Sequence, residues 1–196
     1  MQVAIVTFDR FNEIDSFVAL NILNRMSGLG VRADICAPTP SITSMNGVCL
    51  QNVRPLEFAA SADAVLISSG QGTAQAIADS SVLGRLRLDA TRQLIGSQCS
   101  GALVLAKLGL LDDQPACTDS MTRPALEAAG VRVIESAFHC VGNIATAGGC
   151  LASSYLAAWL LQRKLGDEAV QSALTYVAPV GEEKSFVQRH LTALAL

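Results

Sequence analysis

The sequence lacks a long apolar run, a block of like charge and any C-x-x-C pair. No stretch approaches the roughly 18 uncharged apolar residues that a membrane-spanning helix needs. The formal charge of −3 comes from 14 basic and 17 acidic residues, and because these are not clustered we expect neither nucleic-acid nor membrane binding. The N-terminal stretch "MQVAIVTFDRFNE" has no basic region before its apolar residues, so we expect no signal peptide and a cytoplasmic protein.

Metal-binding and nucleotide-binding patterns are missing as well. The six cysteines are scattered and there are only two histidines, His139 and His190, which argues against a zinc site of standard spacing. Neither a P-loop nor a dinucleotide fingerprint occurs. We therefore expect no metal and no organic cofactor. In a reducing compartment most of the thiols should be free, buried and unreactive, and we expect both histidines to be structural or surface residues.

Apolar residues are abundant instead, at 51% of the 196 residues. A chain of this length and composition can bury a substantial core, and we expect one domain over residues 1–196. β-rich apolar segments alternate with segments of helical period, which predicts an α/β fold with a mostly parallel sheet and helices on both faces. Strands are expected at 2–8, 31–38, 62–72 (running into a Gly-rich turn), 92–98, 115–120, 131–136, 137–141 and 143–148. Helices are expected at 14–30, 73–90, 100–111, 122–130, 149–166 and 167–177, and a hairpin around Asn46-Gly47.

Three loops should lie at the carboxyl ends of the strands, where ligands bind in such sheets. They are the loop that leads to Asp15, the segment "SSGQG" (68–72) and the segment "SQCSG" (97–101). In the third, strand period changes to helical period at Cys99, which is typical of a nucleophile elbow. A cysteine at a helix N-terminus is expected to have a lowered pKa.

Backbone amides near this elbow could stabilise an oxyanion. The N–H of Ser100 would point toward the reacting group, and Gly70 or Gln71 could supply a second N–H. Each feature also has a structural interpretation. Cys99 could be a buried core residue, "SSGQG" a simple turn, and Asp15 an acid that caps or complements its helix. A Cys-His-Asp arrangement is not supported, because the residue after the cysteine is Ser100.

Several segments in this order resemble the ThiJ/PfpI superfamily within the class I glutamine amidotransferase-like fold. The resemblance covers residues 2 to about 180. The segments that carry it are "VAIVTF", the acid Asp15, "VLISSGQG", "IGSQCSGALVLAKLGLLDDQPACT", "GNIATAGGCLASSYLAAWLL" and "ALTYVAPV". It implies a flavodoxin-like three-layer sandwich with Cys99 at the elbow, and a homodimer.

Within this superfamily the sequence is most similar to the isocyanide hydratase branch and to the amidotransferase-like domains of AraC-type regulators. By the hydratase resemblance, Cys99 would attack a small electrophile such as an isocyanide, Asp15 would handle protons, and Ser100 would follow the nucleophile. The run Ala116 to Ser120, "ACTDS", departs from the superfamily's Ala-Thr-Thr-His-Trp, so Asp119 stands where the superfamily often has His. The alternatives are a redox or stress-response protein in which Cys99 is oxidised without turnover, and a ligand-binding regulator.

Overall fold

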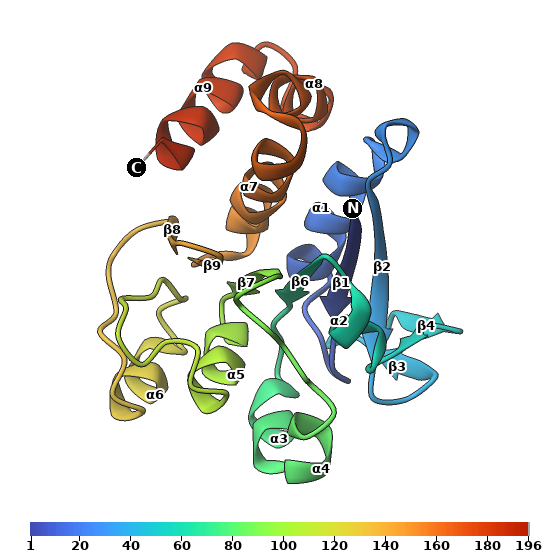
Figure 1. The fold of residues 1–196 in the computed structure, drawn as a ribbon, viewed down its shortest axis with the longest axis vertical. Coiled ribbons are helices and arrows are strands. Elements are labelled where there is room, and N and C mark those ends of the chain that lie inside the picture. Colours follow the sequence, from blue (N-terminus) through green and yellow to red (C-terminus); the bar gives the residue numbers. More distant parts are fainter. Residues whose placement is uncertain (196) are drawn as a thin grey trace.

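A seven-stranded sheet forms the centre of the computed structural model, which describes residues 1–195 (Figure 1). Its strand order is β5-β2-β1-β6-β7-β9-β8, and every neighbouring pair is parallel except β8 and β9. The strands are β1 (Gln2–Val6), β2 (Arg32–Ala37), β5 (Arg54–Pro55), β6 (Ala64–Ile67), β7 (Leu94–Gln98), β8 (Phe138–Val141) and β9 (Ile144–Ala147). The chain leaves β1 to one side and later returns to β6 on the other, so the strand order reverses at this pair. The carboxyl ends of strands at such a point form the crevice in which α/β proteins bind ligands.

Helices cover both faces of the sheet, as the alternating sequence pattern predicts. One face carries α1 (Glu13–Asn24), α7 (Ser153–Leu165), α8 (Asp167–Val177) and α9 (Glu183–Leu194). The other carries α2 (Phe58–Ser61), α3 (Thr73–Ala78), α4 (Ser80–Leu83), α5 (Gly101–Lys107) and α6 (Arg123–Ala128). The fold is therefore a flavodoxin-like three-layer α/β sandwich.

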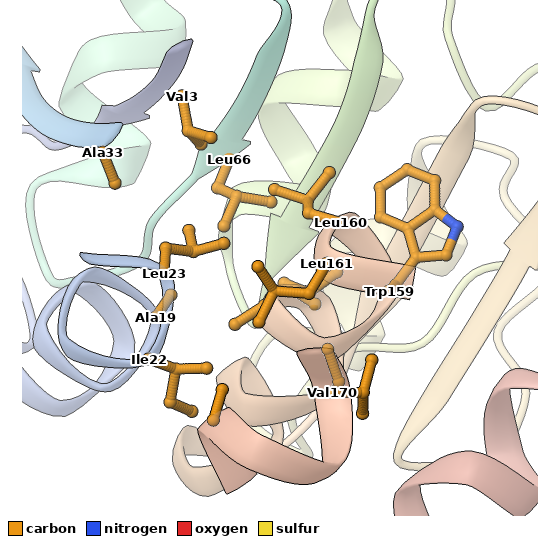
Figure 2. Packing of buried hydrophobic residues seen from close by; sticks show 14 of the residues in the cluster. Val3, Ala19, Ile22, Leu23, Ala33, Leu66, Trp159, Leu160, Leu161 and Val170 are labelled. Carbon is orange, nitrogen blue, oxygen red and sulfur yellow. The ribbon is translucent and has the colours of Figure 1, made fainter. Parts of the chain in front are cut away.

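Strand β1 explains why the buried strands are apolar without interruption. Val3 and Ile5 enter the core beneath α1 and α7, whereas Ala4 and Val6 enter the core on the opposite face. Figure 2 shows side chains of the sheet, α1 and α7 pointing toward one another in the first core. A parallel strand covered on both faces needs apolar residues at every position.

The hairpin predicted around Asn46-Gly47 is present, whereas the helix predicted over 73–90 is divided into α3 and α4. The hairpin is present as β3 (Ser41–Thr43) and β4 (Cys49–Gln51), with Gly47 at a φ of 89° in its turn. The expectation of one helix over 73–90 is wrong, because Asp79 ends α3 and its side chain accepts the Ser81 N–H at the start of α4.

The strands expected at 115–120 and 131–136 are absent as regular elements. They are reduced to a single bridge between Ala116 and Val133. The helix expected from residue 149 begins instead as a 3-10 turn, η2 (Cys150–Ala152), before α7. No helix within residues 1–195 is long and apolar enough to cross a membrane.

Candidate active site

Cys99 occupies a sharp bend between β7 and α5, as the change of sequence period predicts. Its φ is 46°, a left-handed conformation that costs a non-glycine residue about 1–2 kcal/mol. Its N–H donates to the Ala147 carbonyl oxygen at 2.9 Å, which ties the bend to the adjacent strand. A Cβ on Gly101 would lie 2.5 Å from the Ile67 carbonyl oxygen, so a residue larger than glycine cannot start α5 this close to β6.

The Cys99 side chain is only 4% exposed. Gln98 Nε2 lies 3.4 Å from Cys99 Sγ and also donates to the Gly149 carbonyl oxygen at 2.7 Å. Thr118 Oγ1 donates to the Cys99 carbonyl oxygen at 2.9 Å. The thiol is thus held in a defined position with little exposed surface.

Asp15 approaches the thiol from the first turn of α1. The cap of α1 is Asn12, whose Oδ1 accepts the Ile14 N–H at 3.1 Å, so Asp15 is not the capping acid. Asp15 is 2% exposed, and Ser69 Oγ donates to its Oδ2. Its Oδ1 has no hydrogen-bond partner among the described residues. A buried carboxylate oxygen without a partner is costly to keep, which marks Asp15 as more than a packing residue.

Asp15, Cys99 and Cys150 form one cluster. A carboxylate oxygen of Asp15 and the two sulfur atoms all lie within 4.8 Å of one another. Sequence reasoning identified two of these residues and missed Cys150, which it placed at the start of a helix. The cluster is the one group of three potential metal ligands within residues 1–195, and thiolate and carboxylate are donors that zinc accepts.

The ionisation of this cluster differs from the sequence expectation. Burial, followed by the charges of Asp15 and Asp119, raises the pKa of the Cys99 thiol. Burial also raises the pKa of Asp15. The expected lowering of the thiol pKa by the helix N-terminus is therefore wrong, because α5 is a short helix and desolvation beside two acidic groups opposes thiolate formation.

The residues expected to supply oxyanion contacts are close to the elbow but are engaged. Ser100 Oγ accepts the Gly70 N–H at 3.3 Å and contacts Thr73 Oγ1 at 2.9 Å. The Gln71 N–H donates to the Arg10 carbonyl oxygen at 3.0 Å. The second oxyanion donor expected from Gly70 or Gln71 is thus not free in this structure, and Ser100 instead links the elbow to the Gly-rich turn after β6.

Asp119 and His190, both singled out in the sequence, make structural contacts. Asp119 Oδ1 accepts the N–H groups of Met121 and Thr122 at 2.9 and 3.0 Å, which shapes the turn before α6. His190 is buried in α9, where Nε2 contacts Ser154 Oγ and Nδ1 contacts the Phe186 carbonyl oxygen, both at 2.8 Å. Neither belongs to the Asp15 cluster.

Comparison with known proteins agrees with this architecture. The model of the DJ-1/PfpI family matches residues 1–163. The chain is 24% identical to the isonitrile hydratase of Pseudomonas putida over 172 residues, which are 87% of this chain and 75% of that protein.

Solved structures with the same fold include a DJ-1 protein and a transcriptional regulator. Schizosaccharomyces pombe DJ-1 matches with a TM-score of 0.78 at 16% identity, covering 91% of this chain and 100% of that one. An AraC family transcriptional regulator from Pseudomonas putida matches with a TM-score of 0.77 at 18% identity, covering 90% of this chain and 99% of that one. With the family model matching most of its length, the chain belongs to the DJ-1/PfpI family.

Proposed function

We propose that this protein is a cysteine-dependent enzyme that hydrates a small electrophile such as an isocyanide. The observation that carries the proposal is that the Asp15 carboxyl group and the Cys99 thiol are buried side by side, with their reactive atoms within 4.8 Å. Similarity to the Pseudomonas putida isonitrile hydratase supports the choice of substrate class. A terminal isocyanide carbon is small enough to reach a thiol with so little exposed surface.

The first half of the reaction joins the substrate to Cys99. The sulfur attacks the terminal carbon of R–N≡C and forms a C–S bond. Asp15, ionised, accepts the thiol proton and delivers it to the same carbon, which gives the thioimidate S–CH=N–R. A carboxyl group whose pKa is raised by burial is a better proton acceptor than an ordinary aspartate and can return the proton readily.

The second half uses water. Water adds to the thioimidate carbon with Asp15 as the proton carrier, and the nitrogen takes up a proton. The C–S bond then breaks, the sulfur recovers its proton, and an N-substituted formamide leaves. The net change is the addition of one water to the isocyanide. In this scheme we assign the Ser100 N–H the role of backbone donor to the reacting group, and Gly70 and Gln71 hold the turn that carries Ser69.

A panel of alkyl and aryl isocyanides tests the proposal, with formamide measured by chromatography. We expect Cys99→Ala to abolish turnover and Asp15→Asn to lower kcat by about 10²-fold or more, the range for a lost acid–base group. Cys49→Ala is the matched control, because Cys49 is exposed on β4 and far from the proposed chemistry in the fold. Turnover that survives in Cys99→Ala would refute the mechanism.

A second candidate function is that of a redox protein in which Cys99 is oxidised without turnover. The observation that favours it is the second thiol, Cys150, beside Cys99. Intact mass after mild peroxide treatment separates the candidates. A protein that hydrates no isocyanide but gains oxygen or loses hydrogen at Cys99 would be a redox protein.

A further inference from the structure

Cys150 reaches Cys99 because two neighbouring parallel strands end side by side. Gln98 at the end of β7 is in register with Ala147 at the end of β9. The loop after β9 therefore passes over the elbow, and Cys150 Sγ lies within 4.8 Å of Cys99 Sγ. The proposed hydration uses only one of these thiols, so the position of the second needs another explanation.

Each of the two sulfur atoms has its own amide donor. Gln98 Nε2 lies 3.4 Å from Cys99 Sγ, and Asn12 Nδ2 lies 3.2 Å from Cys150 Sγ. A hydrogen bond to sulfur stabilises the thiolate over the thiol. A carboxylate oxygen of Asp15 lies within 4.8 Å of both sulfur atoms, so it is placed to accept a proton from either. Each buried sulfur thus has an amide donor that favours its thiolate and a carboxyl group that can accept its proton.

The residue before Cys150 is a glycine in a backbone conformation that other residues rarely adopt. Gly149 has a φ of 90°, and a Cβ built there would meet nothing within 4 Å. A disulfide needs the sulfurs to close to about 2.05 Å. Cys150 begins the short turn η2 and is partly exposed, so movement of its side chain and of the preceding glycine can supply this closure.

We propose that Cys99 and Cys150 form a reversible disulfide when the protein meets a hydroperoxide. The Cys99 sulfur attacks the terminal oxygen of R–O–OH, the O–O bond breaks, and the thiol proton leaves with the alcohol, R–OH. This oxidises Cys99 to the sulfenic acid. The Cys150 sulfur then attacks the Cys99 sulfur, the S–O bond breaks, and the hydroxyl group leaves as water with the Cys150 proton.

The disulfide would have two consequences. It would remove the nucleophile of the proposed hydration until a thiol reductant restored it, and it would protect Cys99 from irreversible oxidation to the sulfinic acid. The inference shares with the proposed function only the reactivity of Cys99. A disulfide can form whether or not isocyanides are hydrated, so the two proposals can fail separately.

The test uses the full chain carrying Cys49→Ser, which removes the exposed thiol that could cross-link two copies. After hydrogen peroxide treatment and alkylation, we expect a mass lower by about 2 Da at two unalkylated cysteines. Peptide mapping should find a Cys99–Cys150 cross-link, and dithiothreitol should reverse it. Isocyanide turnover, measured on the same samples, reports on the proposed function independently.

Variants show whether Cys150 is the partner. In Cys150→Ser we expect no mass loss, and Cys99 should instead gain about 32 Da as the sulfinic acid. Cys140→Ser is the matched control because Cys140 is a partly exposed thiol on β8 outside the cluster, and it should form the cross-link as the parent does. Recovery of unmodified thiols, or gain of oxygen on Cys99 in the parent without the cross-link, would overturn the inference.

Discussion

Asp15 and Cys99 bring their reactive atoms within 4.8 Å of each other at the carboxyl edge of the sheet. Asp15 comes from helix α1 on one face of the sheet, and Cys99 from the elbow between β7 and α5, a helix on the other face. Both side chains are almost fully buried. Burial, followed by the charge of Asp15, raises the pKa of the thiol, and burial raises the pKa of the carboxyl group. The pair therefore favours a state with a proton on at least one of its members, which suits transfer of that proton during a reaction.

Replacement of Asp15 should separate stability from activity. The pKa of Asp15 is raised in the folded protein, so the unfolded chain loses this proton at lower pH than the folded one. The ordinary pKa of an aspartate is about 3.9. As pH rises from this value through the higher pKa of the folded protein, ionisation of Asp15 consequently lowers the free energy of unfolding. We expect Asp15→Asn to lose about 10²-fold or more in kcat and yet to be more stable than the parent at neutral pH.

Urea denaturation at neutral pH and at about pH 4 checks this prediction. The advantage of Asp15→Asn should shrink at the lower pH, which approaches the ordinary pKa of the carboxyl group, because the folded and unfolded parent then differ less in the protonation of Asp15. Asp113→Asn is a control because Asp113 is exposed. A destabilised Asp15→Asn protein at neutral pH would contradict the argument.

Gly101→Ala should damage the elbow. The added Cβ would lie 2.5 Å from the Ile67 carbonyl oxygen and 2.8 Å from that of Ser68, and these are backbone atoms that cannot rotate away. We expect a loss of about 1–3 kcal/mol in the free energy of unfolding, typical of an overpacked site, together with lower activity. Gly28→Ala, where a Cβ would meet nothing within 4 Å, should change neither. Equal unfolding midpoints for the two variants would count against this view of the elbow.

The sequence predicted the sheet and the elbow because both leave local patterns. Continuous apolar runs mark strands covered on both faces, and a strand period that changes to a helical one marks the bend at Cys99. The position of the loop that leads to Asp15 follows from the rule that parallel strands end at the same edge. These features depend on residues that are close in sequence.

The parts that were missed depend on contacts between distant residues. Cys150 meets Cys99 only through the register of β7 and β9, which no local pattern specifies. The raised thiol pKa reflects burial and neighbouring charge. The sequence indicated only that a helix follows Cys99, and a helix N-terminus alone predicts a lowered pKa. No helix was predicted after residue 177, although Phe186, Val187 and His190 have the helical spacing that could have revealed α9.

His190 should make stability sensitive to mild acid. Burial, assisted by the charge of Arg189, lowers the pKa of His190 from its ordinary 6.5. The unfolded chain therefore binds this proton at higher pH than the folded one, and the free energy of unfolding should fall as pH drops below about 6.5. His190→Gln retains a group able to bond Ser154 but does not titrate. We expect it to flatten the decline between about pH 7 and about pH 5.5 in urea denaturation, and a decline as steep as that of the parent would exclude His190 as the cause.

The family resemblance predicts a homodimer, and the surface beside the cluster of Asp15, Cys99 and Cys150 offers an apolar face for it. Leu151 is 72% exposed and Ile14 is 45% exposed. Both line a hollow of about 480 Å³ between α1, η2 and the start of α9. Exposed apolar patches of this kind are stabilised when another surface covers them.

We expect light scattering to give twice the chain mass for the parent and the mass of one chain for Leu151→Glu. Met121→Glu, which alters a residue that is 88% exposed before α6, should remain dimeric. A parent protein of single-chain mass, or a dimer that survives Leu151→Glu, would show that this face is not the interface.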